Sequence, residues 1–331
     1  MVFLDDHHSY SYRRGDPMNY SFLWFSLINL FLVIILSPLF MTIIKKVKAW
    51  AQMRRGPPIL QGYYNLFKLL RKETIYSPTS SMIMRITPPL NMILLLVAAL
   101  FVPLVYVPSP INGIGNIILF LYLLALAKFL MALAGLDAGS TFGGMGSSRE
   151  MTISAIIEPV VIVIFAALAF VFKTANIHEM VSTAITSPIY LFSPSLILLS
   201  ISLFIVLITE TARVPVDNPE THLELTMIHE AMILEQSGKN LALMEASHAI
   251  KQTLLMALLL NIFLPWGVST SLTFSTVVIG ILLFLVKGIG LCIIIGIFES
   301  SLAKLRLFRL PSLFMIAFFL SFLTILLEVF G

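Results

Sequence analysis

The chain has very little cysteine and very little charge, and both shortages limit what it can be. Its one cysteine among 331 residues is Cys292, which lies within an apolar run. A single thiol excludes a disulfide framework, a cysteine-held iron–sulfur cluster and a cysteine-based zinc site. Charged residues make up 11% of the chain, whereas a soluble protein has about 25%. Because 58% of the residues are hydrophobic, the composition indicates a polytopic membrane protein.

The sequence also shows no evident pattern of a cleavable signal peptide, and we expect none. The first apolar run covers residues 19–44, which is too long for the apolar part of a signal peptide, and it has no small-residue cleavage site. Residues 1–18 form a polar tail that contains His7 and His8. Two histidines can bind a metal, but on a terminal tail we interpret the pair as incidental.

Eight apolar stretches are present, and a membrane-spanning helix needs about 20 apolar residues. We therefore predict an all-α integral membrane protein with a single eight-helix domain over residues 19–331. The fifth stretch is short, while the first and seventh are long enough to tilt. The predicted spans are 19–44, 86–107, 112–134, 153–173, 194–210, 250–268, 273–298 and 311–330.

The basic residues gather in alternate connections between the predicted spans. Sixteen of the 21 lysines and arginines lie in or beside the connections 45–85, 135–152, 210–250 and 299–310. The connections on the other side hold only Arg13, Arg14 and Lys173. By the positive-inside rule the first group faces the cytoplasm. We expect a multi-pass protein of the cell membrane, with both termini and the polar tail outside the cytoplasm.

The longest polar interruption is residues 208–235, which hold six of the 17 acidic residues. Asn218 and Pro219 have the pattern of a helix cap followed by proline at the first helical position. We predict a helix over 219–235 that stops at Gly238. Its faces would carry Glu220 with Glu224, and His222 with Thr226 and His229. A solvated amphipathic helix is the simpler interpretation; a HExxH metalloprotease is a poor one, because position 233 is Ile.

Two other cytoplasmic connections carry patterns. On a helix, residues 62–73 would have an apolar stripe on one face and mostly basic residues on the opposite face. This pattern predicts an interfacial amphipathic helix that binds either lipid or a partner. Residues 135–150 contain five glycines but no GK[ST] motif, so a phosphate-binding loop is a poor interpretation. We expect this segment to be a flexible or tightly packed loop beneath a partner.

Several charges fall inside predicted spans, where ionisable residues are candidates for function. Lys128 and Glu158 would both lie roughly 8–9 Å deep, so they could form an ion pair, and Lys287 would lie roughly 16 Å deep. Glu210 and Glu299 lie at the rims of spans. These charges could form structural pairs, or a relay in which a buried carboxylate changes its protonation state near neutral pH.

The segment ETARVPVDNPETHLEL resembles the signature loop of the complex I membrane subunit that lies beneath the peripheral arm. RRGPPILQGYYNLFKLLRKE is similar to the first cytoplasmic loop of that subunit, and Arg149 and Glu158 match an Arg and a Glu nine residues apart. The matching residues are Glu210, Arg213, Pro215, Asp217, Glu220, Glu224, Leu225, Arg55, Gly56, Pro57, Lys68, Leu69, Lys72 and Glu73.

The departures from this pattern point to one branch of the family. Asn65 stands where an Asp is usual, Val216 replaces a Phe and His222 replaces an acidic residue. The first loop also lacks a glycine-rich insert that quinone-reducing members carry. The segment THLELTMIHEAM is similar to energy-converting membrane-bound NiFe-hydrogenases, including formate hydrogenlyase, and residues 302–311 with Glu299 fit that branch too. These departures argue against a quinone site.

The resemblance implies a membrane anchor subunit of a redox-driven ion pump. An iron–sulfur small subunit and a hydrogenase-like large subunit would dock on the cytoplasmic side, and antiporter-like subunits would lie alongside to move H⁺ or Na⁺. The iron–sulfur clusters and the NiFe site would belong to these partners, with no redox cofactor or metal in this chain. The expected coupling residues are Glu210, Asp217, Glu220, Glu224, Glu158, Lys128, Lys287 and Glu299; the expected docking residues are Arg55, Lys68, Lys72, Glu73, Arg149, Arg213, His222 and His229.

Alternative functions remain open. A quinone-reducing complex predicts a cavity between the first span and the amphipathic helix. A sulfur-reducing complex predicts the same membrane architecture with a different soluble arm. A stand-alone ion transporter leaves the charged cytoplasmic surface unexplained, and no catalytic constellation supports an intramembrane enzyme. Nothing in the sequence suggests binding of nucleic acid.

Overall fold

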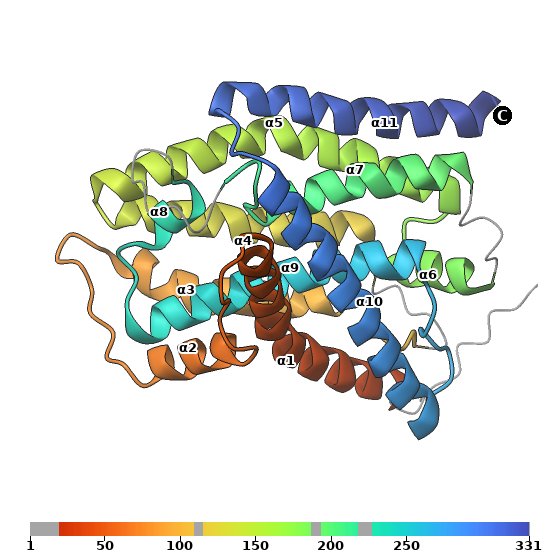
Figure 1. Cartoon of the computed structure of the whole chain (residues 1–331), viewed down its shortest axis with the longest axis horizontal. Coiled ribbons are helices and arrows are strands. Elements are labelled where there is room, and N and C mark those ends of the chain that lie inside the picture. Colours follow the sequence, from red (N-terminus) through yellow and green to blue (C-terminus); the bar gives the residue numbers. More distant parts are fainter. Residues whose placement is uncertain (1–19, 109–114, 187–192, 218–226, 331) are drawn as a thin grey trace, which may run out of the picture.

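A computed structural model describes residues 20–108, 115–186, 193–217 and 227–330. These residues fold into helices joined by turns, and none of them forms a β-strand. Figure 1 shows most of the long helices side by side, with α1 and α10 crossing the others obliquely. The α-helices are α1 (Tyr20–Ala51), α2 (Gln61–Leu70), α3 (Met82–Ala99), α4 (Ile117–Asp137), α5 (Thr141–Phe172), α6 (Ile177–Thr186), α7 (Pro194–Glu210), α8 (His229–Ile233), α9 (Gly238–Phe263), α10 (Phe274–Ser301) and α11 (Leu310–Phe330).

Each of the eight predicted spans coincides with a helix, which confirms the fold class. Seven of these helices are long and apolar enough to cross a membrane, and α7 is the shorter eighth with 17 residues. The longest are α1 and α5, with 32 residues each. The predicted amphipathic helix is α2, and none of its residues is buried. A helix that was not predicted, α6, follows α5 at the opposite end of the bundle (Figure 1).

Helix α9 is the centre of the fold, and 83% of its apolar window is buried. It packs against α1, α2, α3 and α7, while α11 packs on α5 and α7 at one side of the bundle.

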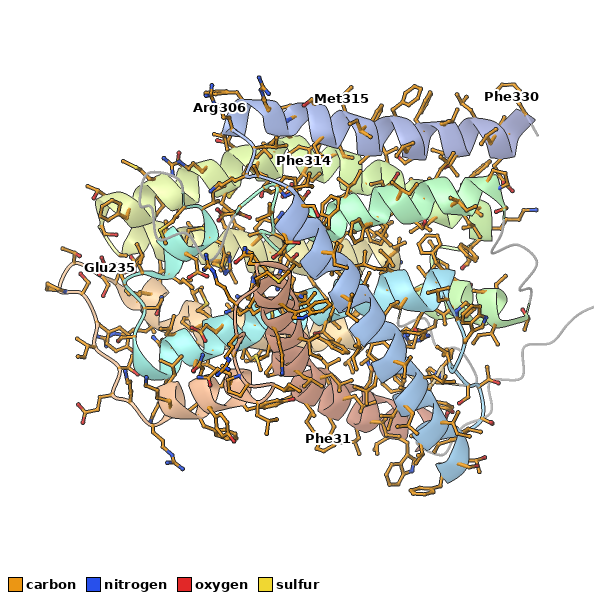
Figure 2. The ribbon with its side chains drawn as sticks, in the orientation of Figure 1. Phe31, Glu235, Arg306, Phe314, Met315 and Phe330 are labelled. Atoms are coloured by element: carbon orange, nitrogen blue, oxygen red, sulfur yellow. The ribbon has the colours of Figure 1, made fainter. Side chains whose placement is uncertain are left out.

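Figure 2 shows the two faces of α11: Phe314 points toward the bundle and Met315 points away. Phe314 is 1% exposed and Met315 60% exposed. Apolar side chains on the outer face of such a bundle suit contact with lipid or with another membrane subunit.

The segment 135–150 was predicted to be a loop, and this was wrong. Helix α5 begins at Thr141, and the Ser140 hydroxyl caps it by accepting a hydrogen bond from the Gly143 backbone. The small residues serve close packing, because a Cβ on Gly146 would lie 2.9 Å from both the Ala231 side chain and the Ile228 carbonyl. Gly146 therefore lets α5 approach α8, whereas Gly143 lets it approach the Gly135 carbonyl of α4.

The helix predicted over 219–235 is also corrected. Residues 218–226 lie outside the described part of the chain, and only His229–Ile233 of the remainder is helical. Gly238 does not stop a helix, since it is the first residue of α9. Its φ of +50° and the Glu73 carbonyl oxygen, which would lie 2.2 Å from an added Cβ, explain why glycine is needed there.

Candidate functional site

Charged residues meet where α7 ends, at the end of the bundle that carries α2, α8 and the turn between α4 and α5. Thr211 closes α7 by donating its hydroxyl hydrogen to the Leu207 carbonyl at 2.6 Å. The chain then turns through Ala212, which has a φ of +46°, and the Arg213 backbone bonds back to Ile208. Glu210 at the end of α7 and Arg213 and Asp217 in this turn face different neighbouring segments, and each forms its own ion pair.

Glu210 forms the first of these groups, which we call the Glu210 cluster together with Lys128 and Lys251. Lys128 of α4 places Nζ 2.6 Å from Glu210 Oε1, and Lys251 of α9 places Nζ 2.7 Å from Oε2. Each carboxylate oxygen of Glu210 therefore faces its own lysine ammonium group. All three side chains are nearly buried. One carboxylate therefore pairs with two lysines in the interior of the bundle, and the three side chains together keep one positive charge.

Lys128 was expected to pair with Glu158, but its ion-pair partner among the described residues is Glu210. Glu158 lies beside them on the rim of a cavity of about 300 Å³ between α4 and α5, which Lys128 and Glu210 also line. Unlike the cluster, Glu158 is exposed. An exposed carboxylate inside a spanning helix is costly in lipid, so this position calls for water or a neighbouring protein.

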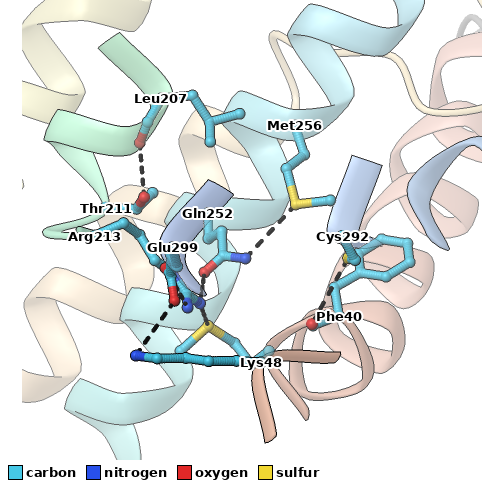
Figure 3. A network of polar contacts seen from close by, with 10 residues as sticks. Phe40, Lys48, Leu207, Thr211, Arg213, Gln252, Met256, Cys292 and Glu299 are labelled. Carbon is cyan, nitrogen blue, oxygen red and sulfur yellow. Dashed lines mark hydrogen bonds and ion pairs between the residues drawn. The ribbon is translucent and has the colours of Figure 1, made fainter. Parts of the chain in front are cut away.

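The second group, the Glu299 cluster, joins Glu299 to Arg213, Lys48 and Gln252 (Figure 3). Arg213 places Nη1 3.1 Å from Glu299 Oε1 and donates from Nη2 to Gln252 Oε1 at 2.6 Å. Lys48 Nζ lies 3.7 Å from Glu299 Oε2. Because the four side chains come from α1, α9, α10 and the turn after α7, the cluster ties these elements together at one point.

The third group is the Asp217 clamp, formed by Asp217, Lys304 and the start of α8. Lys304 donates to Asp217 Oδ1 at 2.6 Å, and the Ile228 and His229 amides donate to Oδ2 at 3.1 Å each. The Leu305 amide also donates to the Pro215 carbonyl. The clamp therefore holds the turn after α7 against the connection between α10 and α11.

Two histidine rings in close contact lie next to the Glu210 cluster. The rings of His229 and His248 have their centroids 4.2 Å apart at an angle of 42°. Burial lowers the pKa of His229 to about 4, although the nearby Asp217 carboxylate opposes this shift. His229 was expected in docking, whereas the structure places it against α9.

Two further cavities lie on either side of this pair. One is a pocket of about 330 Å³ between α1, α2, α8 and α9, with Lys45, Asn65 and Glu245 in its wall. The other holds about 20 Å³ and includes Glu150 and Glu210 in its wall. His229 and His248 line both. The small cavity in turn shares Lys128 and Glu210 with the cavity between α4 and α5.

The other predicted residues lie apart from these groups or outside the described chain. Arg55, Lys68, Lys72 and Glu73 are exposed on and beside α2. Arg149 donates to the Met227 carbonyl at 3.0 Å. Lys287 donates to Asn261 and to the Leu264 carbonyl at the far end of α9, so it caps that helix. Glu220, His222 and Glu224 lie outside the described residues.

Sequence reasoning did not single out the polar residues of α9. Glu245, His248 and Gln252 follow one another at helical spacing, and Lys251 adds the second partner of Glu210. The predicted span began at residue 250, whereas α9 begins at Gly238. The i, i+3, i+7 spacing of these polar residues was the signal that could have placed them on one helix face.

Comparison with known proteins assigns the chain to a family. The sequence profile of the NADH dehydrogenase family matches residues 24–329. The chain belongs to this family. It is 30% identical to formate hydrogenlyase subunit 4 of Escherichia coli K12, over 91% of this chain and 98% of that protein. It is 32% identical to hydrogenase-4 component C of the same organism, over 85% and 88%.

A solved structure shares the fold. The likeness is to a chain in the structure of the membrane-bound sulfane sulfur reductase, an archaeal respiratory membrane complex, with a TM-score of 0.76 and 21% identity over 92% of this chain and 99% of that one. Together with the two hydrogenase relatives, these matches confirm the resemblance drawn from the sequence. The chain is a membrane subunit of a redox-linked complex.

Proposed function

We propose that this chain anchors a soluble hydrogenase-type arm on the cytoplasmic side of the cell membrane and couples electron transfer in that arm to movement of H⁺ or Na⁺. The observation that carries the proposal is the Glu210 cluster, a nearly buried carboxylate between two lysines, 2.6 and 2.7 Å away. It lies beneath the connections that carry most of the basic residues. A buried charge group at that place can respond to charge changes in a docked arm.

The docking face would be formed by α2 and the connections around it. Arg55, Lys68, Lys72 and Glu73 are exposed there, so they are free to meet an iron–sulfur small subunit and a hydrogenase-like large subunit. The outer stripe of α2 is apolar, with Tyr64 58% and Phe67 61% exposed. That stripe suits the lipid surface, as expected for an interfacial helix that lies beside a docked protein.

The coupling path would run from this face into the bundle. The Asp217 clamp joins the turn after α7 to the connection between α10 and α11. A charge change in the arm that weakened the Asp217–Lys304 pair would therefore move this turn, which carries Arg213 and directly follows Glu210. Ion pairs of this kind have two discrete arrangements, paired and separated, which is what a coupling element needs. We also propose that the cytoplasmic end of this path includes Glu220, Glu224 and His222.

The lateral partners would meet the bundle at the exposed face of α4 and α5. Glu158 is exposed on that face, inside a spanning helix, next to a cavity that reaches the Glu210 cluster. An antiporter-like subunit covering this face would give Glu158 a polar neighbour. A change of charge at the Glu210 cluster would then reach that subunit through Glu158. Lys287, which caps α9 at its far end, would act in structure rather than in this path.

The redox cofactors are proposed to reside in the partners. With Cys292 as its one cysteine, the chain lacks the thiolates that iron–sulfur clusters and NiFe sites require. The orientation is proposed from the charge distribution: sixteen basic residues lie at the cytoplasmic end, which places both termini outside.

The test is ion uptake by proteoliposomes that contain the complex purified through this chain. H₂ evolution from a low-potential donor drives the uptake, and Glu158→Gln and Glu210→Gln should lower the number of ions moved per H₂. Glu328→Gln is the matched control, because Glu328 is exposed at the far end of α11. If both the Glu158 and the Glu210 variant keep the wild-type ratio, the proposed coupling path is wrong.

A quinone-reducing complex is the second candidate, and one observation favours it. The pocket of about 330 Å³ lies between α1 and α2, where that alternative predicts a cavity. Its wall carries Lys45, Glu230 and Glu245, so it is far more charged than an isoprenoid chain prefers. Inhibition of the purified complex by a short-chain quinone analogue would favour this candidate; H₂ evolution that the analogue leaves unchanged would exclude it.

A further inference from the structure

The connection between α10 and α11 is short and joins two membrane-spanning helices. Helix α10 ends at Ser301 and α11 begins at Leu310, so the connection comprises residues 302–309. Both helices are long and apolar enough to cross a membrane. A connection of this length cannot extend far from the membrane surface, so its side chains lie at or near the level of the lipid headgroups.

The end of α1 marks the same depth. Lys48 lies in the last turn of α1, and its Nζ is 3.7 Å from Oε2 of Glu299 near the end of α10, so the two helix ends lie at one level. Trp50 follows in α1 and is 75% exposed. Tryptophan rings favour the level of the lipid headgroups. The connection after α10 therefore starts at that level.

Two contacts fix the first half of the connection to the bundle. The Lys304 ammonium group donates to Asp217 Oδ1 at 2.6 Å, and the Leu305 amide donates to the Pro215 carbonyl at 2.9 Å. At the other end, Leu310 is buried with 1% exposed. Residues 306–309 are therefore held at both ends, which lowers the cost of ordering them when a ligand binds.

A short 3-10 helix, η2 (Leu307–Arg309), then places two arginines on one side. The Arg309 amide donates to the Arg306 carbonyl at 2.8 Å. Residues three apart lie above one another in such a helix. Both arginines are exposed, and among the described residues no hydrogen bond or ion pair reaches their guanidinium groups. Figure 2 shows Arg306 at the edge of the molecule, where it points away from the bundle.

Large apolar side chains accompany the two arginines. Phe308 is 93% exposed and Leu302 is 42% exposed. A ligand that covers this surface must combine negative charge with apolar groups. Arginine binds phosphate through two parallel hydrogen bonds, and two unpaired guanidinium groups favour a ligand with net negative charge. At the depth of the headgroups, a phospholipid supplies the phosphate and the acyl chains together.

We propose that the connection between α10 and α11 is a binding site for an anionic phospholipid. Arg306 and Arg309 hold the phosphate of the headgroup, and Phe308 and Leu302 contact the first part of the acyl chains. The site is separate from the three charge clusters, since its arginines form none of their ion pairs. The proposal goes beyond the proposed function and does not depend on it.

The test is photolabelling of the complex, purified through this chain and placed in phosphatidylcholine nanodiscs. The probes are photoactivatable phosphatidylglycerol and photoactivatable phosphatidylcholine with the same acyl chains, and mass spectrometry measures labelling of residues 302–312. The phosphatidylglycerol probe should label this segment several-fold more strongly. Arg306→Gln/Arg309→Gln should lower its labelling about tenfold or more, because each basic residue near an anionic headgroup strengthens association. Arg306→Lys/Arg309→Lys keeps both charges and should keep most of the labelling.

Arg54→Gln/Arg71→Gln is the matched control. It also removes two exposed arginines, from the connection after α1 and the end of α2. This variant should keep the wild-type labelling of residues 302–312. If its labelling decreases as much as that of Arg306→Gln/Arg309→Gln, the effect is one of total charge and the site is wrong.

Three other results would overturn the site. They are equal labelling by the two probes, unchanged labelling in Arg306→Gln/Arg309→Gln, and a segment that neither probe labels but a bifunctional cross-linker joins to another subunit. Where the glutamine variant does not assemble, unlabelled lipids compete with the probe on the wild-type complex. Phosphatidylglycerol should displace it at lower concentration than phosphatidylcholine, and equal displacement would overturn the site. Labelling needs neither H₂ evolution nor ion movement, so failure of the proposed function is a separate outcome.

Discussion

Replacing Glu210 by glutamine should destabilise the bundle more than any single loss of an exposed charge. The amide keeps the shape of the side chain but removes the charge that lies 2.6 Å from Lys128 and 2.7 Å from Lys251. Both lysine side chains are nearly buried, with exposed fractions of 6% and 12%. They would then be left without the carboxylate that pairs with them.

The size of the effect can be bounded from both sides. Removing one partner of a buried ion pair costs about 3–5 kcal/mol, because an uncompensated charge stays behind. A lysine can escape this cost by losing its proton, which at pH 7 takes about 4–5 kcal/mol for a group with an ordinary pKa near 10.4. We therefore expect Glu210→Gln to lower the free energy of unfolding by about 3–5 kcal/mol.

The assay is thermal unfolding of the purified complex in mild detergent, followed by the loss of this chain from the soluble fraction. The double variant Glu210→Gln/Lys251→Met removes one of the two stranded charges, so it should recover about 1–3 kcal/mol of the loss. Glu235→Gln is the control, because Glu235 is exposed on the turn after α8 and points away from the bundle (Figure 2). A Glu210→Gln complex as stable as wild type, or a double variant whose losses simply add, would refute the assignment of a coupled charge cluster.

Three further predictions follow from the structure. Asp217→Asn should cost about 2–4 kcal/mol and speed limited proteolysis of residues 211–237, because the amide weakens the Lys304 contact; unchanged cleavage would count against the clamp. Gly288→Ala should cost about 1–3 kcal/mol, since its new Cβ would lie 2.5 Å from a ring of α1, whereas Gly290→Ala meets nothing within 4 Å; equal melting temperatures would contradict this. The pKa of His229 is about 4 in the folded state against 6.5 ordinarily, so the unfolded chain binds the proton first as pH falls: stability from this group is full above pH 6.5 and decreases by about 3 kcal/mol toward pH 4. Hydrogen exchange of α8 that does not increase over that range would contradict the assignment.

The helices were predictable because their cause is local in sequence. Apolar stretches of sufficient length and the stripe of α2 are visible without any tertiary contact, and each gave a helix at the expected place. The resemblance to the hydrogenase branch was also carried by local motifs, and the comparisons confirm it.

The charge pairing was not predictable in the same way. Depth along two helices suggested Lys128 with Glu158, but rotation about the helix axis decides which side chain faces which neighbour. Glu158 points to the outer face of α5, and Glu210 reaches Lys128 from α7. Lys251 escaped notice because it was counted with a loop, although α9 begins well before it.

The glycines show a second limit. A run of small residues indicates either a loop or close packing, and sequence alone does not say which. Here α8 packs against the first turns of α5, and a Cβ on Gly146 would collide with it. The residues against which Gly146 packs lie more than 80 positions away in the chain, so the local pattern does not reveal this contact.

The central claim is that this chain couples a docked hydrogenase-type arm to ion movement, and one measurement tests it most directly. The complex is purified through this chain in mild detergent, analysed for nickel and iron, and reconstituted into proteoliposomes that are driven by a low-potential donor. The account predicts nickel and iron in the preparation, H₂ evolution, and ion uptake that an ionophore abolishes. Iron without nickel or H₂ would move the chemistry to a sulfur- or quinone-reducing arm, and a metal-free chain that moves ions alone would contradict the account.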